Sequence, residues 1–97
     1  MTGTRRSSDG LDIRRRKLLF RSWHRGMREV DLVLGGFADA HIDALTAAEI
    51  DQYERLLEIA DTELIAWLTG GQPVPAEHQS PLLDRVLAFR AATTFQT

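Results

Sequence analysis

The sequence predicts an all-α fold, a compact bundle of about five short helices. Apolar residues recur at helical spacing in almost every segment, and no segment alternates apolar and polar residues as a half-buried strand does. The length of 97 residues suits one small domain. We therefore expect a flexible N-terminal arm at residues 1–10, a five-helix domain at 11–92 and a frayed C-terminus at 93–97.

The first helix is expected within residues 11–25, and it is amphipathic. Its predicted buried side carries Leu19, Phe20 and Trp23. Its predicted basic side carries Arg14, Lys17, Arg21 and Arg25. Gly26 is well placed to end the helix in the left-handed conformation, where a side chain would be strained. The second helix follows at once.

One apolar stripe defines the second helix. It consists of Val30, Val33, Leu34, Phe37 and His41. The pair Gly35-Gly36 interrupts this helix and weakens it by about 1 kcal/mol per glycine relative to alanine. A helix that keeps two such residues is expected to pack closely against a neighbour at that point.

Three further helices are predicted from their N-terminal signals. The segment 46–49, Thr-Ala-Ala-Glu, is a capping box, Asp61 is a predicted N-cap, and Ser80-Pro81 places an N-cap before a first-turn proline. The residues expected to face the core are Ile50, Tyr53, Leu56, Leu57 and Ala60 in the third helix, Leu64, Ile65, Trp67 and Leu68 in the fourth, and Leu82, Leu83, Val86, Leu87 and either Phe89 or Arg90 in the fifth. Glycines and prolines at 70–75 predict the loop before the last helix.

The charges are distributed unevenly along the chain. Residues 1–28 hold nine basic and two acidic residues, a net of +7, whereas residues 29–97 hold three basic and twelve acidic residues, a net of −9. Such asymmetry bears on partners and association rates rather than on the fold. For the charge alone, a solvated N-terminal face plus a disordered basic arm is the favoured interpretation.

The residues give little support to catalysis. The chain has no cysteine, and His24, His41 and His78 fall on three separate elements without metal-site spacing. The acidic residues Glu49, Asp51, Glu54 and Glu58 resemble a solvated helix face. No phosphate-binding loop, nucleophile elbow, secretory signal or apolar run of membrane-spanning length is present. We expect a cytoplasmic protein that is not an enzyme.

Two binding hypotheses follow from the residues. In the first, the basic segment Arg14–Arg28 tracks nucleic-acid phosphates, although the acidic remainder of the chain opposes a polyanion. In the second, a protein partner contacts the helix-helix corner at Arg25, Gly26, Met27 and Glu29. A glycine lets a partner backbone approach closely, and methionine offers an adaptable apolar contact. Judged by spacing alone, however, such a segment is more often a plain helix–turn–helix corner.

The corner also carries a family motif. Residues 25–29 read Arg-Gly-Met-Arg-Glu, within the longer segment Leu-Leu-Phe-Arg-Ser-Trp-His-Arg-Gly-Met-Arg-Glu-Val-Asp at 18–31. Phe37, the segment Tyr53–Asp61, Leu64, Trp67-Leu68, Gly70 and Pro73 follow in order. With its Arg-Gly-x-x-Glu signature, the chain resembles the SdhE family of succinate dehydrogenase assembly factors over residues 13–90.

This resemblance implies a function that spacing alone does not supply. Members of the family bind the flavoprotein subunit of succinate dehydrogenase, and in some bacteria that of fumarate reductase, and promote covalent attachment of FAD to a histidine of that client. The client forms its own flavin bond. Carried over to this chain, Arg25, Gly26 and Glu29 are expected to bind the client, with Met27, Arg28 and Asp31 beside them. We expect no stably bound cofactor or metal, no nucleic-acid partner, no membrane insertion and a monomer.

Overall fold

The computed structural model describes residues 10–93, and within that range the chain is helical. The elements are α1 (Ile13–Trp23), α2 (Arg28–His41), the 3₁₀ helix η1 (Ile42–Ala44), α3 (Ala47–Leu56), α4 (Asp61–Leu68), the 3₁₀ helix η2 (Ala76–His78) and α5 (Pro81–Thr93). The prediction of an all-α bundle with five main helices is confirmed. The predicted flexible arm at 1–10 and frayed end at 93–97 lie, apart from Gly10 and Thr93, outside the described residues.

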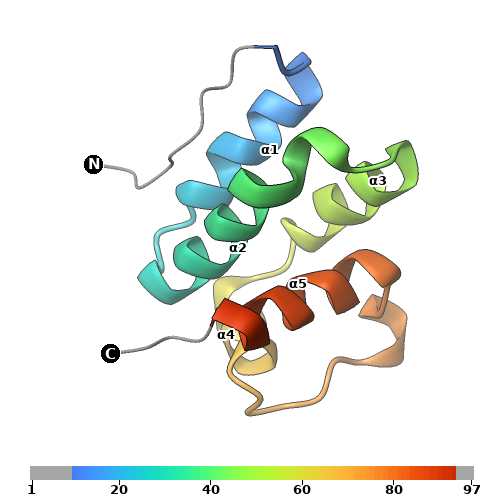
Figure 1. The fold of residues 1–97 in the computed structure, drawn as a ribbon. Coiled ribbons are helices and arrows are strands. Elements are labelled where there is room, and N and C mark those ends of the chain that lie inside the picture. Colours follow the sequence, from blue (N-terminus) through green and yellow to red (C-terminus); the bar gives the residue numbers. More distant parts are fainter. Residues whose placement is uncertain (1–9, 94–97) are drawn as a thin grey trace.

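Helix α2 is the centre of the bundle. It lies beside α1 and also contacts α4 and α5, while α3 packs against α5 (Figure 1). The apolar stripe predicted for α2 faces this core, with Val30, Val33, Leu34 and Phe37 all buried. The Phe37 ring meets the edges of Tyr53 and Phe89 at centroid distances of 6.0 and 5.9 Å. These ring contacts join α2 to α3 and α5.

The glycine pair of α2 lies at a close helix approach, as its sequence position predicts. A Cβ atom on Gly35 would come within 2.6 Å of Cε3 in the Trp23 indole, and one on Gly36 would come within 3.3 Å of the Phe89 ring. The indole Nε1–H donates to Asp39 Oδ1 at 3.2 Å. Gly35 therefore makes room for the side chain that packs α1 onto α2.

Buried polar side chains also hold α1 to the core. The hydroxyls of Ser22 and Tyr53 are hydrogen-bonded to each other, and either one is able to be the donor. The other hydroxyl then donates to its own backbone carbonyl, Leu18 O at 2.7 Å for Ser22 or Leu34 O at 3.1 Å for Tyr53. Burial raises the pKa of Tyr53 well above its ordinary value. The phenol stays neutral and links α1, α2 and α3.

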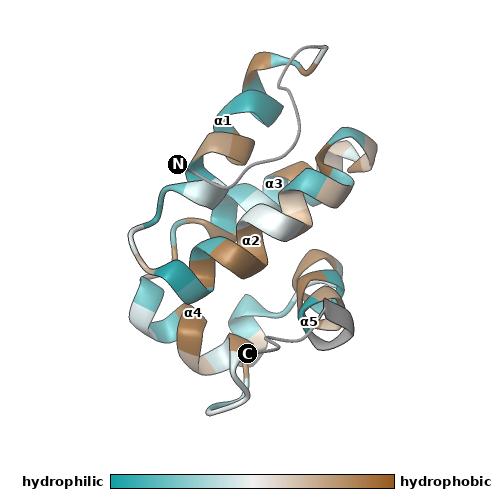
Figure 2. Cartoon of the chain, turned by 60° about the vertical axis from the view of Figure 1, so that its left-hand side comes forward, coloured by the Kyte–Doolittle hydropathy of each residue, from teal (hydrophilic) through white to brown (hydrophobic). Residues whose placement is uncertain are grey.

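Phe20 does not face the core, and the prediction that it does is wrong. Its side chain is 63% exposed, whereas Leu18, Leu19 and Ser22 are buried. At about 100° per residue, a core-facing direction centred between Leu18 and Ser22 turns Phe20 to the opposite side of α1. Coloured by hydropathy, α1 shows both hydrophilic and hydrophobic stretches (Figure 2). Apolar residues on both sides of this helix explain the error.

Two predictions near residue 60 are also wrong. Helix α3 ends at Leu56, and Ala60, predicted to face the core, is exposed and is the N-cap of α4. Asp61 is the first residue of α4, and its carboxylate pairs with Arg25 rather than capping its own helix. The capping box at Thr46 and Glu49 and the Ser80 cap of α5 are present as predicted. Over residues 10–93, no helix combines the length and apolarity needed to cross a bilayer.

Candidate functional site

The predicted site is the corner that joins α1 to α2, residues 24–29. Gly26 has a φ of +101°, a conformation that L side chains rarely adopt, and a Cβ atom there would meet nothing within 4 Å. The backbone conformation, rather than crowding, is therefore what requires glycine. Because Gly26 is exposed and has no side chain, the main chain of the corner is open to a partner.

Arg25 anchors the corner to the turn between α3 and α4. Its Nε donates to Asp61 Oδ1 at 2.6 Å, its Nη1 donates to the Leu57 carbonyl at 2.6 Å, and its Nη2 donates to the Ile59 carbonyl. The side chain is only 13% exposed. The planar guanidinium serves three acceptors at once, an arrangement that the single ammonium of lysine does not reproduce. Arg25 was predicted to touch a client, and in this structure its head group faces inward.

Asp31 and Met27 fix the other side of the corner. Asp31 Oδ1 accepts the backbone N–H of Arg25 at 3.0 Å, and the Asp31 N–H donates to the Met27 carbonyl at 2.9 Å. The Met27 side chain is half-buried against the core. These two residues hold the backbone on either side of Gly26 in place.

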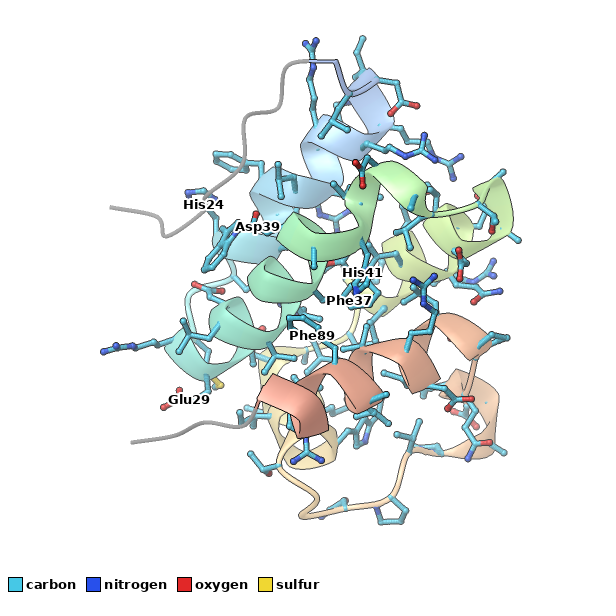
Figure 3. All side chains as sticks on the ribbon, in the orientation of Figure 1. His24, Glu29, Phe37, Asp39, His41 and Phe89 are labelled. Atoms are coloured by element: carbon cyan, nitrogen blue, oxygen red, sulfur yellow. The ribbon has the colours of Figure 1, made fainter. Side chains whose placement is uncertain are left out.

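Arg28 and Glu29 face outward instead. Both are exposed in the first turn of α2, and Figure 3 shows Glu29 pointing away from the bundle. Among residues 10–93, neither side chain has a hydrogen bond or ion pair. The six predicted residues therefore divide into three that stabilise the corner, Arg25, Met27 and Asp31, and three that present it, Gly26, Arg28 and Glu29. Their contact with a client stays a prediction.

Two arginines of α1 pair with carboxylates of α3 and of the turn that follows it. Arg14 forms ion pairs with Asp51 and Glu54, and Arg21 pairs with Glu58 at 3.0 Å. The hydrogen bonds from Arg14 hold the pKa of Glu54 below its ordinary value. Each exposed pair adds only about 0–1 kcal/mol. Even so, the pairing leaves fewer free cations for phosphates than the sequence implies.

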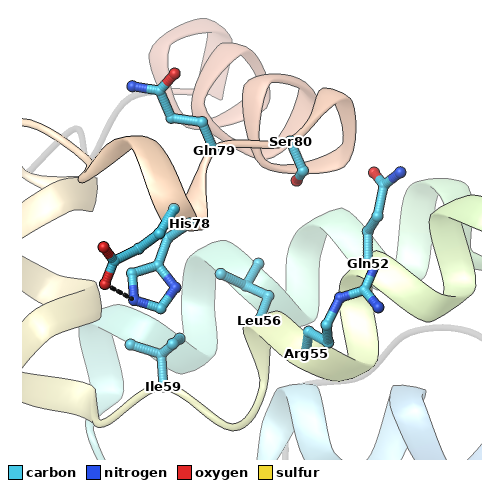
Figure 4. Close-up of a pocket in the computed structure, with 8 residues that line it drawn as sticks. Gln52, Arg55, Leu56, Ile59, His78, Gln79 and Ser80 are labelled. Carbon is cyan, nitrogen blue, oxygen red and sulfur yellow. Dashed lines mark ion pairs between the residues drawn. The ribbon is translucent and has the colours of Figure 1, made fainter.

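A small cleft lies between α3 and the segment before α5 (Figure 4). Three of its polar side chains already form hydrogen bonds within the chain. Gln52 accepts the Leu82 N–H at 3.0 Å, Ser80 caps the Leu83 N–H at 3.0 Å, and Gln79 donates to the carbonyl of Val74 at 3.1 Å. These bonds fix the approach to α5, and they favour a structural role for the cleft over a cofactor site.

The three histidines are separated in the fold as they are in the sequence. His24 stacks on Phe20, His41 lies against Phe37 and Phe89, and His78 lies against Trp67. Within residues 10–93, no group of three or more histidines and carboxylates could hold a metal ion. Each ring packs against an aromatic neighbour, which favours aromatic packing over metal ligation for all three.

The sequence patterns did not predict the ion pair between Asp61 and Arg25 or the exposure of Phe20. Asp61 looked like a cap because it opens a helix, and its partner Arg25 lies 36 residues away. Phe20 looked like a core residue because it is aromatic and follows two leucines. A helical wheel alone does not choose between the two apolar sides of α1, and the burial of Leu18 and Ser22 shows which side faces the core.

Comparisons with known proteins identify a family for the chain. Residues 16–90 match the family Sdh5, described as "Flavinator of succinate dehydrogenase". The chain is 44% identical over 81 residues to the "FAD assembly factor SdhE" of Acetobacter pasteurianus, a match that covers 84% of this chain and 74% of that protein. It is similar to proteins named "Succinate dehydrogenase assembly factor 2, mitochondrial", with 33% identity in Danio rerio and 36% in Candida glabrata, over 87% and 88% of this chain.

The lengths of these relatives differ from that of this chain. The matches cover 54% of the Danio rerio protein and 58% of the Candida glabrata protein, so the chain spans about half the length of its mitochondrial relatives. No solved structure matches the chain significantly. The family match nevertheless covers all five helices except for the first turn of α1 and the last residues of α5. The chain therefore belongs to the Sdh5 family, the flavinators of succinate dehydrogenase.

Proposed function

We propose that this chain is an assembly factor that binds the flavoprotein subunit of succinate dehydrogenase and promotes covalent attachment of FAD to it. The observation that carries this proposal is the match to the flavinator family over residues 16–90, together with 44% identity to an FAD assembly factor. The Arg-Gly-x-x-Glu segment lies at a rigid, accessible corner, which suits a docking surface. In organisms that have one, the related flavoprotein of fumarate reductase is a second proposed client.

The client-binding surface that we propose is the corner itself. Glu29 and Arg28 offer side chains that have no partner among residues 10–93, and Gly26 exposes the main chain between them and α1. Arg25, Met27 and Asp31 act on the client through the shape of the corner, because their polar groups or side chains are engaged within the bundle.

The proposed mechanism is preorganisation rather than catalysis by this chain. Covalent flavin attachment requires the client histidine, the flavin ring and a charge-stabilising pocket to be aligned at the same time. A partner that binds the aligned client conformation more tightly than the others raises its population, by tenfold for each 1.4 kcal/mol of differential binding. No group of this chain has to enter the reaction, so we propose that the chain is not an enzyme and binds no FAD stably.

Three further parts of the proposal concern the location of the protein, its oligomeric state and nucleic-acid binding. We propose a cytoplasmic location, supported by the similarity to a bacterial relative. We propose that the free chain is a monomer. We also propose that it binds no nucleic acid, because three of its basic side chains, Arg14, Arg21 and Arg25, already pair with carboxylates. Gel shift with duplex DNA at low salt and sedimentation of the free chain check these two points.

Covalent flavin in the client tests the function directly. Cells lacking this gene are complemented with wild type, Glu29→Ala or Glu63→Ala, and the denatured flavoprotein subunit is scored for retained flavin fluorescence. Glu63 is a matched control because it is also an exposed glutamate in the first turn of a helix. Both substitutions remove a similar helix-dipole interaction, about 0.3–1 kcal/mol. We expect wild type and Glu63→Ala to restore covalent flavin and Glu29→Ala to fail while remaining folded.

The result that would reject the proposal is equal covalent flavin with and without the gene. Failure of both glutamate variants would instead trace the loss to helix α2 or α4 stability, and thermal unfolding of the purified variants would show it.

A further inference from the structure

One side of α1 faces away from the bundle and carries an ordered series of exposed residues. Ile13, Lys17, Phe20 and His24 recur at spacings of four, three and four, so they lie along one face of the helix, opposite Leu18 and Ser22. We call these four residues the outer stripe. Ile13 and Phe20 are 68% and 63% exposed. Two large exposed apolar side chains on one helix face offer apolar area to a partner.

The aromatic part of the outer stripe is held in place before any partner binds. The rings of Phe20 and His24 stack at 3.9 Å with an interplanar angle of 14°, and His24 Nδ1 is hydrogen-bonded to the Phe20 carbonyl at 2.7 Å. Side chains that are already ordered lose little conformational freedom on binding. The pair therefore offers a flat aromatic surface at low entropic cost.

A third exposed apolar side chain lies on α2. Leu32 is 43% exposed and shares a helix face with Gly35 and Asp39, the two residues that hold the Trp23 indole. Trp23 is three residues from Phe20 on α1. Within residues 10–93, the three large apolar side chains with high exposure, Ile13, Phe20 and Leu32, are thus all on α1 and α2.

The charge of this side indicates the chemistry of its partner. The arginines that face α3 are paired with carboxylates, whereas Arg16 and Lys17 are exposed and have no ion pair among the described residues. The partner surface that fits is apolar at its centre and acidic at its rim, because each free cation then gains a carboxylate. A uniformly apolar partner would leave both cations without compensation.

The size of the corner argues that its partner needs this second surface. A stable interface buries about 800 Å² per partner and takes about 20–30 residues a side. The corner presents only Gly26, Arg28 and Glu29 outward. His24 ends the outer stripe and directly precedes Arg25 in the sequence, so the outer stripe and the corner follow one another along the chain.

We propose that the outer stripe is a second docking surface for the flavoprotein subunit, contacting an apolar patch flanked by carboxylates on that client. This inference rests on the proposed function, since it names the same partner. Phe20 is its central apolar contact, and Lys17 and Arg16 set its charge preference.

The test is a binding titration of the purified flavoprotein subunit with the full chain. The variants are Phe20→Ala and Lys17→Glu on the outer stripe, Glu29→Ala at the corner and Arg55→Glu as a control, because Arg55 is an exposed cation on α3 away from the stripe. We expect Phe20→Ala and Lys17→Glu each to raise the Kd at least tenfold. Arg55→Glu should bind as wild type. Thermal unfolding should be nearly unchanged for all, since every replaced side chain is exposed.

The outcomes separate the two proposals. If Glu29→Ala weakens binding while both outer-stripe variants bind as wild type, the second surface is refuted and the proposed function stands. If wild type does not bind the flavoprotein subunit, both fail. Sedimentation of the free chain and flotation with phosphatidylglycerol vesicles test the other occupants. If Phe20→Ala reduces self-association or vesicle binding and leaves client binding unchanged, the occupant is a second copy or a lipid surface, and the inference is wrong.

Discussion

Replacement of Arg25 by alanine should destabilise the whole bundle. The size of this loss distinguishes an Arg25 that holds the corner to the bundle from one that contacts the client. The guanidinium donates to Asp61 and to the carbonyls of Leu57 and Ile59. Alanine leaves those three acceptors without that donor, and the Asp61 side chain is only 25% exposed. An unsatisfied buried polar group costs about 1–3 kcal/mol. Partial access of water to Asp61 reduces its share, so we expect a total loss of about 2–4 kcal/mol.

That loss is large for a chain of this size. Stability of small domains lies at about 5–15 kcal/mol, and 1 kcal/mol shifts the midpoint by about 4–8 °C. Arg25→Ala should therefore lower the Tm by about 10–25 °C and remain folded in the cold. The Tm of Arg25→Lys should lie between those of wild type and Arg25→Ala, because an ammonium reaches Asp61 without also reaching both carbonyls. Circular dichroism during urea and thermal unfolding measures these differences.

A double-mutant cycle assigns the effect to the pair. Arg25→Ala and Asp61→Ala, alone and together, should show a coupling energy of about 1–3 kcal/mol. If Arg25→Ala unfolds within about 0.5 kcal/mol of wild type and still loses the client, Arg25 acts by touching the client, and the anchor derived from its hydrogen bonds is refuted.

Four other substitutions, at three positions, test single features of the chain. Gly26→Ala should cost about 1–2 kcal/mol in urea unfolding, because φ is +101°, and keep client binding, whereas Gly26→Arg should lose binding by filling the open corner. Gly35→Ala should lower the free energy of unfolding by about 1–3 kcal/mol, although alanine has the better helix propensity, because its Cβ meets the Trp23 ring. Tryptophan fluorescence and a Trp23–Asp39 hydrogen bond that are both unchanged from wild type would contradict this. The pKa of Glu49 is lowered by the Thr46 N–H and Arg85, so its contribution is present above the ordinary value of 4.5 and is lost as pH falls below it. Glu49→Gln should therefore be less stable than wild type at neutral pH, with a gap that shrinks on acidification; a gap constant with pH would reject the charge effect.

Local signals in the sequence predicted much of the fold, because helix caps and periodicity act within a few residues. The Thr46 capping box, the Ser80 cap and the apolar stripe of α2 are present as the pattern indicates. Even the close approach at Gly35 follows from the cost of keeping glycine inside a helix. These features depend on neighbours three or four positions away.

Contacts between distant segments could not be predicted in the same way. From the sequence alone, Arg25 is equally compatible with an exposed surface cation and with a buried anchor. Only the position of the turn at 57–61, which supplies its hydrogen-bond acceptors, decides between these two roles. The motif was therefore assigned to client contact as a unit, although the structure turns its arginine inward and its glutamate outward. Ala60 was misplaced for a related reason, because the helical period continues through a turn where the helix has ended.

The inward orientation of Arg25 bears on how such a corner could act on a client. Fixing a free backbone costs about 1–2 kcal/mol per residue. A mobile loop over residues 25–29 would lose several kcal/mol of binding energy to its own ordering, and that energy would be missing from the client. Arg25 and Asp31 order the corner during folding, so contacts made by Glu29 can instead favour one client conformation. On this argument Arg25→Lys weakens client binding even at temperatures where the bundle is fully folded, without altering any outward-facing side chain.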